Sequence, residues 1–449
     1  MQKMKNNGRV KTFKFVLLML VSLHATAQEP LRKIWPGVIC HSAKNNLKVD
    51  SVFEGGAFQR CGLQPGDQLL RINTQDVSTS DDVQRICQPL RAGDTLCVEW
   101  MHQNQRKKKC IQAPARPVRK LAWCQLEYAW VQHENAWLRS MVYKPVNSSN
   151  PLPAIFFLPG YTCSSIESFP DNYNGRLIRH WVEQGFLVYT VEKSGLGDNA
   201  HCLPCQSVDL GTDISFYTSA WNTLCRRNDI RSDALFIWGH SMGGILAPLI
   251  HGVYEPTGIL VYGTVYRPWS EFLLEMHRVQ KPLLEKLDAI QTEEFMRSIQ
   301  AIYFDFFVRK KTPAELDRVN EYHKLVRSEL EYEDGKESMW GRHWRFWQQL
   351  DSVNLAQAWQ QTTAKVLVMH GGADYIQCSA LEPYLIREAV NRGHAAKAEL
   401  LVFPDMDHML LQSRNYEEAV QRFNRKEYLT QALHPEFLRK TTAWMKGLL

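Results

Sequence analysis

Six short runs of this sequence are apolar at almost every position. They lie at residues 154–158, 185–189, 234–238, 258–262, 366–369 and 400–403. Strands that are apolar on both faces and alternate with helical segments form parallel sheets that helices cover on both sides. The pattern over residues 121–449 therefore predicts an α/β domain. Two earlier stretches of alternating polarity, near residues 124–131 and 136–142, predict an antiparallel hairpin that leads into its sheet.

A long segment separates the fourth apolar run from the fifth. Residues 267–361, about 95 positions, are rich in charged and aromatic side chains and follow a helical period. A compact domain does not accommodate a structureless loop of this length. We expect the segment to be a helical cap that is inserted into the α/β domain.

The N-terminal part of the chain, residues 30–113, has a different pattern. Alternation at residues 47–52 and 95–101 predicts half-buried strands, and residues 80–90 combine an N-cap with helical spacing. The basic run Lys107-Lys108-Lys109 is typical of a solvated hairpin tip. A connector rich in proline and arginine, residues 114–120, predicts a semi-rigid linker between two domains.

One stretch of this N-terminal unit carries a long signature. The pattern V-x-x-G-x-A-x-x-x-x-G-L-x-P-G-D-x-L-x-x-I-N is formed by Val52, Gly55, Ala57, Gly62, Leu63, Pro65, Gly66, Asp67, Leu69, Ile72 and Asn73. The unit therefore resembles a PDZ domain of the bacterial protease-associated kind. The resemblance implies a bound peptide C-terminus as partner, and a carboxylate-binding loop at residues 35–38 with Gly37 and Val38. Pro36 is a departure there, because it removes one N–H donor.

The first 27 residues predict a signal peptide. Five cations and no acid precede an apolar run at residues 15–23, and Ala25-Thr26-Ala27 has the small-x-small pattern of a cleavage site. The run is shorter than the roughly 20 residues that span a bilayer, and we find no later run of that length. The formal net charge is +6, and cleavage of the leader would remove five cations and leave +1. A charge this small does not favour binding to nucleic acid. We expect export to the periplasm or the extracellular space.

The 11 cysteines all follow the predicted leader. Their odd number and irregular spacing do not indicate a disulfide scaffold. Cys202 and Cys205 are the close pair, and in an exported chain a local disulfide or two free thiols is favoured over a redox motif. Their pairing stays open at this stage. A second C-x-x-C pair is missing from the sequence, so we expect no metal site.

A candidate nucleophile follows the third apolar run. Gly239-His240-Ser241-Met242-Gly243 is a G-x-S-x-G segment between a predicted strand and a predicted helix. This is the strand–turn–helix setting of a nucleophile elbow, in which a sharp turn exposes the serine. Pro248 falls inside the helix that should follow and predicts a kink there.

A serine hydroxyl needs a base that removes its proton, and the base needs a carboxylate that orients it. His408 lies in the loop after the last apolar run, and Asp374 lies in the loop after the run before it. Both loops open at the carboxyl edge of the sheet, where such sites lie. Asp405 and Asp407 compete for the acid's role, but neighbours in a tight loop seldom face the ring. Ser241, His408 and Asp374 are therefore the predicted triad.

The developing oxyanion needs two backbone N–H donors. We expect one from Met242, directly after the nucleophile, and one from Tyr161 in the loop after the first apolar run. Trp269 and Glu271, at the start of the cap segment, are candidates for the substrate pocket. A charged cap contains acids such as Glu271 and Glu275 in any case, and core packing is an equal explanation for Trp269.

On these motifs, residues from about 120 to 449 resemble an α/β-hydrolase of the esterase, lysophospholipase and serine-aminopeptidase-like group. The resemblance implies a mostly parallel sheet with helices on both faces and a helical cap. It also implies acyl transfer through an acyl-serine, with no metal or cofactor. The favoured function is an exported serine hydrolase that cleaves carboxylic esters. One alternative is a serine peptidase, of aminopeptidase or dipeptidyl-peptidase type, that recruits peptides by its PDZ domain. Another is a non-catalytic peptide-binding protein.

Overall fold

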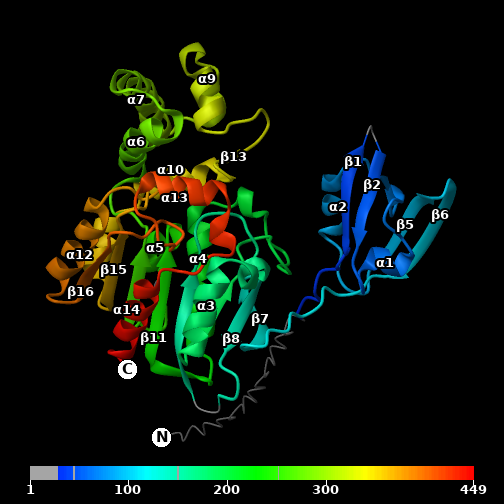
Figure 1. Cartoon of the computed structure of the whole chain (residues 1–449), viewed down its shortest axis with the longest axis horizontal. Coiled ribbons are helices and arrows are strands. Elements are labelled where there is room, and N and C mark those ends of the chain that lie inside the picture. Colours follow the sequence, from blue (N-terminus) through cyan, green and yellow to red (C-terminus); the bar gives the residue numbers. More distant parts are fainter. Residues whose placement is uncertain (1–28, 44–45, 149–150, 251) are drawn as a thin grey trace, which may run out of the picture.

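The structure, a computed structural model, describes residues 29–43, 46–148, 151–250 and 252–449. The predicted leader at residues 1–27 lies outside this part of the chain. Among the described residues no helix has the length and apolar character that a membrane crossing requires. The chain forms one small antiparallel sheet and one large mixed sheet, joined by an extended connector (Figure 1).

The small sheet contains six strands in the order β1-β2-β3-β5-β6, with β4 paired to β3. The strands are β1 (Val38–Ala43), β2 (Asn46–Val52), β3 (Gln68–Ile72), β4 (Gln75–Asp76), β5 (Thr95–His102) and β6 (Gln105–Gln112). Two short helices complete the unit, α1 (Ala57–Cys61) and α2 (Ser80–Cys87). Its core contains Leu47 and Leu69 from the sheet and Phe58 from α1, all without solvent exposure. The unit thus has a hydrophobic core of its own.

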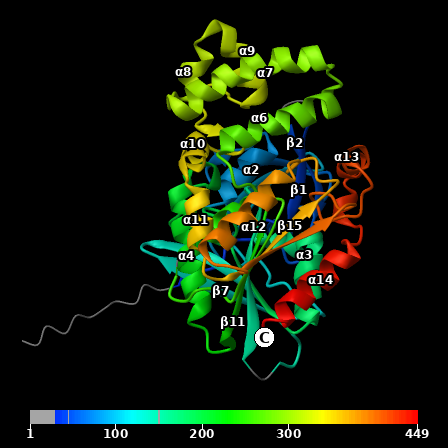
Figure 2. The ribbon, with the colours of Figure 1, turned by 90° about the vertical axis from the view of Figure 1, so that its left-hand side faces the viewer.

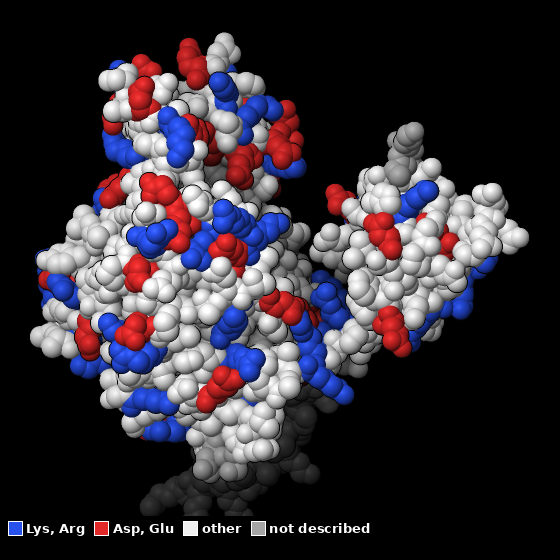
Figure 3. All heavy atoms as spheres, in the orientation of Figure 1, with Lys and Arg blue, Asp and Glu red and all other residues white. Residues whose placement is uncertain are grey.

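The basic run Lys107-Lys108-Lys109 lies within a strand and not at a hairpin tip, so the prediction of a hairpin tip is wrong. Lys107, Lys108 and Lys109 lie in β6 opposite Trp100, Glu99 and Val98 of β5. The turn is formed instead by residues 103 and 104, which both have positive φ. Lys108 forms an ion pair with the buried Glu99 carboxylate. Exposed lysines on an edge strand hinder pairing with another chain, and this basic edge is visible in Figure 3.

The large sheet contains eight strands in the order β16-β15-β12-β11-β9-β10-β8-β7. The hairpin β7 (Gln125–His133) and β8 (Ala136–Lys144) is antiparallel, as predicted, and β8 pairs antiparallel with β10. The remaining pairs are parallel. The six predicted apolar runs became β9 (Leu152–Leu158), β10 (Leu187–Val191), β11 (Ile230–His240), β12 (Gly258–Tyr262), β15 (Lys365–Gly371) and β16 (Ala398–Phe403).

Helices cover both faces of this sheet. Successive strand residues point to opposite sides, and both sides of the buried strands are apolar. Phe156 of β9 belongs to the core beneath α4, α5, α11 and α12, whereas Phe157 belongs to the core beneath α3 and α14. These helices are α3 (Tyr173–Glu183), α4 (Leu210–Cys225), α5 (Met242–Leu246), α11 (Leu355–Gln361), α12 (Leu381–Gly393) and α14 (Pro435–Lys446). Helix α13 (Tyr416–Asn424) and 3₁₀ turns at Ile166–Asp171, Cys205–Ser207, Ala247–Leu249 and Glu427–Leu429 lie in the connections.

The segment between β12 and β15 forms the helical cap. Its helices are α6 (Trp269–Gln280), α7 (Ala289–Tyr303), α8 (Pro313–Asp317), α9 (Asn320–Glu329) and α10 (Trp344–Ser352). Lys281–Glu285 and Phe304–Val308 extend α6 and α7 as π-helical turns, and β13 (Ser338–Met339) pairs with β14 (Arg342–His343). Figure 2 shows α6, α7 and α9 beyond the end of the sheet where its parallel strands finish. The cap core is continuous with one face of the sheet.

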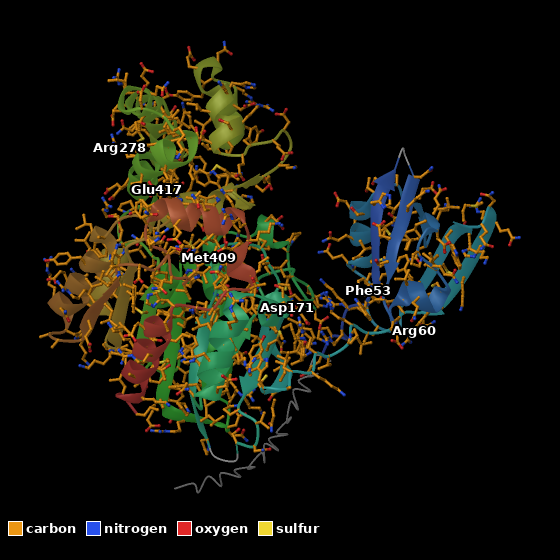
Figure 4. All side chains as sticks on the ribbon, in the orientation of Figure 1. Phe53, Arg60, Asp171, Arg278, Met409 and Glu417 are labelled. Atoms are coloured by element: carbon orange, nitrogen blue, oxygen red, sulfur yellow. A yellow bond between two sulfur atoms is a disulfide. The ribbon has the colours of Figure 1, made fainter. Side chains whose placement is uncertain are left out.

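Charged contacts attach the N-terminal unit and the connector to the large domain. Arg32 forms ion pairs with Glu167 at 2.6 Å and with Asp198 at 2.7 Å. Arg91 donates to the backbone carbonyls of Asp198 and Asn199. In the connector, Arg119 forms two hydrogen bonds to Asp171, which is labelled in Figure 4.

Candidate active site

Ser241 lies in the sharp turn between β11 and α5. Its φ is 56° and its ψ is −122°, a conformation that few non-glycine residues adopt. The two glycines of the segment are required, because a Cβ on Gly239 would lie 2.5 Å from the Gly243 carbonyl oxygen, and one on Gly243 would overlap the Leu158 carbonyl. The Ser241 N–H donates to the Tyr262 carbonyl at 2.9 Å, which fixes the turn to β12. Helix α5 ends at Leu246 before Pro248, so the proline shortens this helix.

His408 and Asp374 are in direct contact. The Nδ1 atom of His408 lies 2.9 Å from Oδ2 and 3.1 Å from Oδ1 of Asp374. The carboxylate is fully buried and also accepts the backbone N–H groups of Ile376 and Gln377. Burial opposes ionisation, but His408 and these donors hold the pKa of Asp374 below its ordinary value. The pair therefore has the geometry in which a carboxylate orients an imidazole.

The competing acids have other partners. Asp407 is buried and accepts the N–H groups of Met409 and Leu411 and the Ser413 hydroxyl, so it shapes the loop that carries His408. Asp405 contacts His434 and Gln412. Neither carboxylate is hydrogen-bonded to the His408 ring within the described residues.

Ser241 and His408 line the same cavities at the carboxyl edge of the sheet. In the described part of the chain no hydrogen bond joins the two side chains, and such bonds often tighten only when substrate binds. The His408 ring packs 4.8 Å from the ring of His240, measured between centroids. His240 in turn donates from Nε2 to the backbone carbonyl of His408 at 2.8 Å, and burial lowers its pKa to about 3. A neutral His240 thus supports the His408 backbone.

The two predicted oxyanion donors border the same space. Met242 is the first residue of α5, where backbone N–H groups have no acceptor within the helix. Tyr161 lies in the loop after β9, and this loop passes close to Ser241, since a Cβ on Gly160 would lie 3.7 Å from the Ser241 Cβ, an ordinary van der Waals contact. Both residues line the cavity that contains Ser241. Figure 4 labels Met409, next to His408, between the sheet and the cap.

This geometry can be compared with known families. The model of the family described as serine aminopeptidase, S33, matches residues 154–415, more than half of the chain. This chain belongs to the serine aminopeptidase S33 family. A PDZ domain model matches residues 48–95. The predicted α/β-hydrolase fold, the serine hydrolase class and the N-terminal PDZ domain are therefore confirmed.

Solved structures similar to this S33 chain include esterases and a peptidase. An esterase from Pyrococcus furiosus is 14% identical with a TM-score of 0.44, covering 75% of this chain and 97% of its own. A carboxyl esterase from Bacillus coagulans is 12% identical with a TM-score of 0.43, covering 72% and 98%. A proline iminopeptidase from Mycobacterium smegmatis is 16% identical with a TM-score of 0.44, also covering 72% and 98%. No curated protein matches the chain.

Two cavities of this S33 domain meet at Ser241. The cap cavity has a volume of about 250 Å³ and lies between the elbow and the cap. Most of its wall is apolar, with Met242, Ile245, Val265, Trp269, Phe272, Leu273, Met276, Tyr303, Trp340 and Trp347. The outer cavity, about 450 Å³, is bordered by more polar groups, among them Ser164, Ser168, Asn172 and Asn174. Tyr161, Ile376 and His408 line both.

The structure corrects one pocket prediction. Trp269 lines the cap cavity as expected, but Glu271 is exposed and is not among the residues that line it. The acids that do line the cap cavity are Glu329 and Glu331, at the end of α9 and just after it. A helical period does not tell which of many cap acids faces inward, so the sequence held no signal for this pair.

In the PDZ domain the predicted carboxylate loop contacts α1. The carbonyl groups of Trp35 and Pro36 accept the N–H groups of Ala57 and Phe58, and the Gly37 carbonyl accepts that of Phe53. Gly37 has φ +64° and packs against Gly56, where a Cβ would lie 2.7 Å from the Gly56 Cα. β1, which begins at Val38, is an edge strand of its sheet. The assignment of Gly37 and Val38 to a peptide carboxylate stays a prediction.

The sequence does not determine how the cysteines pair, and the structure contains two disulfides. Cys97 pairs with Cys110 across β5 and β6, and Cys163 pairs with Cys205. The second bridge links the loop after β9 to the segment after β10, and Cys202 keeps a free thiol. A local Cys202–Cys205 disulfide is therefore excluded. Among the described residues no cluster of His, Cys, Asp or Glu has a metal-binding arrangement.

Proposed function

We propose that Ser241, His408 and Asp374 form a catalytic triad that hydrolyses carboxylic esters with apolar acyl groups. The observation that carries the proposal is the cap cavity, whose apolar wall ends at Ser241. Apolar pockets with a few polar groups at the reacting centre are typical of small-molecule sites. An acyl chain that leaves water for this wall gains roughly 0.8 kcal/mol per buried methylene.

In the proposed mechanism the Ser241 Oγ attacks the ester carbonyl carbon while the His408 Nε2 accepts the hydroxyl proton. The Asp374 carboxylate stabilises the resulting imidazolium through Nδ1. The N–H groups of Tyr161 and Met242 donate to the oxyanion of the tetrahedral intermediate. The C–O bond to the leaving alcohol then breaks, and the alcohol takes the proton from His408. A water molecule repeats the cycle on the acyl-serine and releases the acid.

A specific observation favours aminopeptidase activity as a second candidate. Glu329 and Glu331 line the same cavity, and a carboxylate there would hold the ammonium group of a peptide N-terminus. Glu329 is already paired with Lys281 at 2.9 Å. Glu331 makes no ion pair or side-chain hydrogen bond within the described residues. Glu331 is thus the residue on which an amine-bearing substrate depends.

A substrate panel separates the two candidates. p-Nitrophenyl esters from acetyl to decanoyl and aminoacyl p-nitroanilides would be compared on wild-type protein, Glu331→Gln and the exposed control Glu333→Gln. Ester cleavage that rises with acyl length and survives Glu331→Gln supports the esterase. Anilide cleavage that Glu331→Gln abolishes and Glu333→Gln spares makes the protein an aminopeptidase instead.

We also propose that the chain is exported and that its PDZ domain binds a peptide C-terminus. The leader pattern of residues 1–27 supports export. The disulfides Cys97–Cys110 and Cys163–Cys205 agree with it, since such bonds persist in oxidising compartments. N-terminal sequencing of the secreted protein tests the cleavage after Ala27. Calorimetric titration with a C-terminal peptide library, with and without C-terminal amidation, tests the PDZ ligand.

A further inference from the structure

The oxyanion loop, residues 159–163, has to hold one backbone N–H group toward the reacting carbonyl. The loop borders both cavities and contains Gly160. Glycine has no Cβ, so it leaves the φ and ψ angles of the loop almost unrestricted at this position. Catalysis by an oxyanion hole depends on donors that are already in place before charge develops. Something in the surrounding structure therefore has to fix the Gly160–Tyr161 peptide.

The side chain of Lys193 makes two contacts with this loop. Lys193 follows β10 closely, is only 6% exposed, and lies beside the loop after the neighbouring strand β9. Its ammonium group donates to the Gly160 carbonyl and, at 2.6 Å, to the Thr162 carbonyl. These are the carbonyls on either side of Tyr161.

The geometry of the peptide bond means that this contact also orients the Tyr161 N–H group. The Gly160 carbonyl and the Tyr161 N–H belong to the same trans peptide unit, so they point in opposite directions. An ammonium group that holds the carbonyl on one side of the loop therefore directs the N–H to the other side. Rotating this peptide would break a hydrogen bond and leave a buried carbonyl without its donor.

A second cation holds the carbonyl between these two. Arg342 of β14 is fully buried, donates from Nη1 to the Tyr161 carbonyl at 3.3 Å, and forms an ion pair with Asp213 of α4. Three successive carbonyls of the oxyanion loop thus accept from Lys193 or Arg342. The Cys163–Cys205 disulfide secures the end of the loop to the segment that begins at Lys193.

We infer that Lys193 is a positioning residue for catalysis, which orients the Tyr161 N–H by holding the carbonyls of Gly160 and Thr162. The inference rests on the proposed function, because it needs Ser241 as nucleophile and Tyr161 as oxyanion donor. Lys193 acts on the transition state through the loop and not on substrate binding. Its removal should therefore lower kcat and leave KM nearly unchanged.

The test compares Lys193→Met, Lys193→Gln and Lys193→Arg with wild type and with the control Lys144→Met. Lys144 also forms ion pairs, with Glu127 and Asp229, but it lies in β8 outside both cavities. For each variant, kcat and KM on a p-nitrophenyl ester, the rate of labelling by a fluorophosphonate and the melting temperature are measured. The labelling rate reports on attack by Ser241 without depending on the choice of ester.

In folded Lys193→Met we expect kcat and the labelling rate to fall together by about 10²-fold, with KM within about threefold. Lys193→Arg should recover at least about tenfold of this loss, since it keeps a buried cationic donor. Lys144→Met should keep kcat within about twofold of wild type.

An unchanged kcat in any folded Lys193→Met or Lys193→Gln protein would overturn the inference, and so would a raised KM at constant kcat. Equal losses in the Met and Arg variants would assign the effect to packing and would also overturn it. If none of the three variants folds, Lys193 is a structural residue and not a positioning one. A wild-type protein that is neither active nor labelled would instead remove the proposed function, and the inference with it.

Discussion

Gly263 follows β12 with its backbone at φ +62°, directly against His408 and Asp374. A Cβ at this position would lie 2.8 Å from Cε1 and 2.9 Å from Nδ1 of His408, and 3.2 Å from Oδ2 of Asp374. Real Cβ contacts of this kind are rarely closer than about 3.4 Å. Gly263→Ala should therefore displace the imidazole by roughly half an ångström.

The expected cost follows from this displacement. The contact between His408 and Asp374 is 2.9 Å at present, and the ring cannot retreat from position 263 and keep that alignment. A misplacement of about 1 Å costs on the order of 10²-fold in rate, so kcat should fall by about 10- to 10²-fold. The positive φ adds a loss of about 1 kcal/mol in the free energy of unfolding, because a Cβ disfavours this region.

Gly185→Ala is the matched control. Gly185 has φ +96°, and a Cβ there meets nothing within 4 Å. Both variants should lower the urea midpoint, whereas Gly263→Ala alone should lower kcat on a p-nitrophenyl ester. A Gly263→Ala protein with the kcat of Gly185→Ala would refute the placement of His408 and Asp374 described above.

Three further predictions concern buried charges. Asp374→Asn should reduce kcat by about 10³- to 10⁴-fold, because an amide cannot stabilise the His408 imidazolium. Asp407→Asn should mainly lower the free energy of unfolding. Steady-state kinetics and urea denaturation of both variants measure these two effects. Burial raises the pKa of Glu192 from 4.5 to about 7, so the folded state binds this proton more tightly than the unfolded state. Wild-type stability should then decline by about 3 kcal/mol as pH rises from 4.5 to 7, and denaturation of Glu192→Gln over the same range should lack this contribution. Arg32→Ala leaves the buried carboxylates of Asp198 and Glu167 without their main partner. The free energy of unfolding should fall by about 1–3 kcal/mol, while kcat stays within a few-fold of wild type. An unchanged urea midpoint would contradict this contact between the two domains.

Local pattern predicted most of the large sheet. Strands that are buried on both faces are apolar throughout, and β12 begins and ends where the pattern placed it, at residues 258 and 262. Ser241, Asp374 and His408 each follow the end of a parallel strand, so the order of strands and loops along the chain was enough to predict that they meet at one edge of the sheet. The position of Pro248 likewise predicted a disturbed helix, and α5 ends two residues before it.

Contacts between distant segments were not predictable in this way. Cys163 pairs with Cys205 across 42 positions, and nothing near either cysteine marks its partner. Lys193 is a charged residue beside an apolar strand, which in sequence is typical of a solvated loop. Its role depends on β9 and β10 being neighbours in the sheet. The prediction of a hairpin tip at Lys107–Lys109 was wrong for a related reason. An edge strand can carry as many exposed charges as a turn, so the charges do not distinguish the two.

In the proposed mechanism Ser241 forms a covalent acyl-enzyme with assistance from His408. Intact-mass spectrometry of the mature protein after incubation with a fluorophosphonate tests it most directly, with tandem spectrometry to locate the adduct. We expect one adduct on Ser241 in wild type, none in Ser241→Ala, and strongly slowed labelling in His408→Ala. An adduct on another serine that persists in folded Ser241→Ala, or a wild-type protein that does not react, would contradict it.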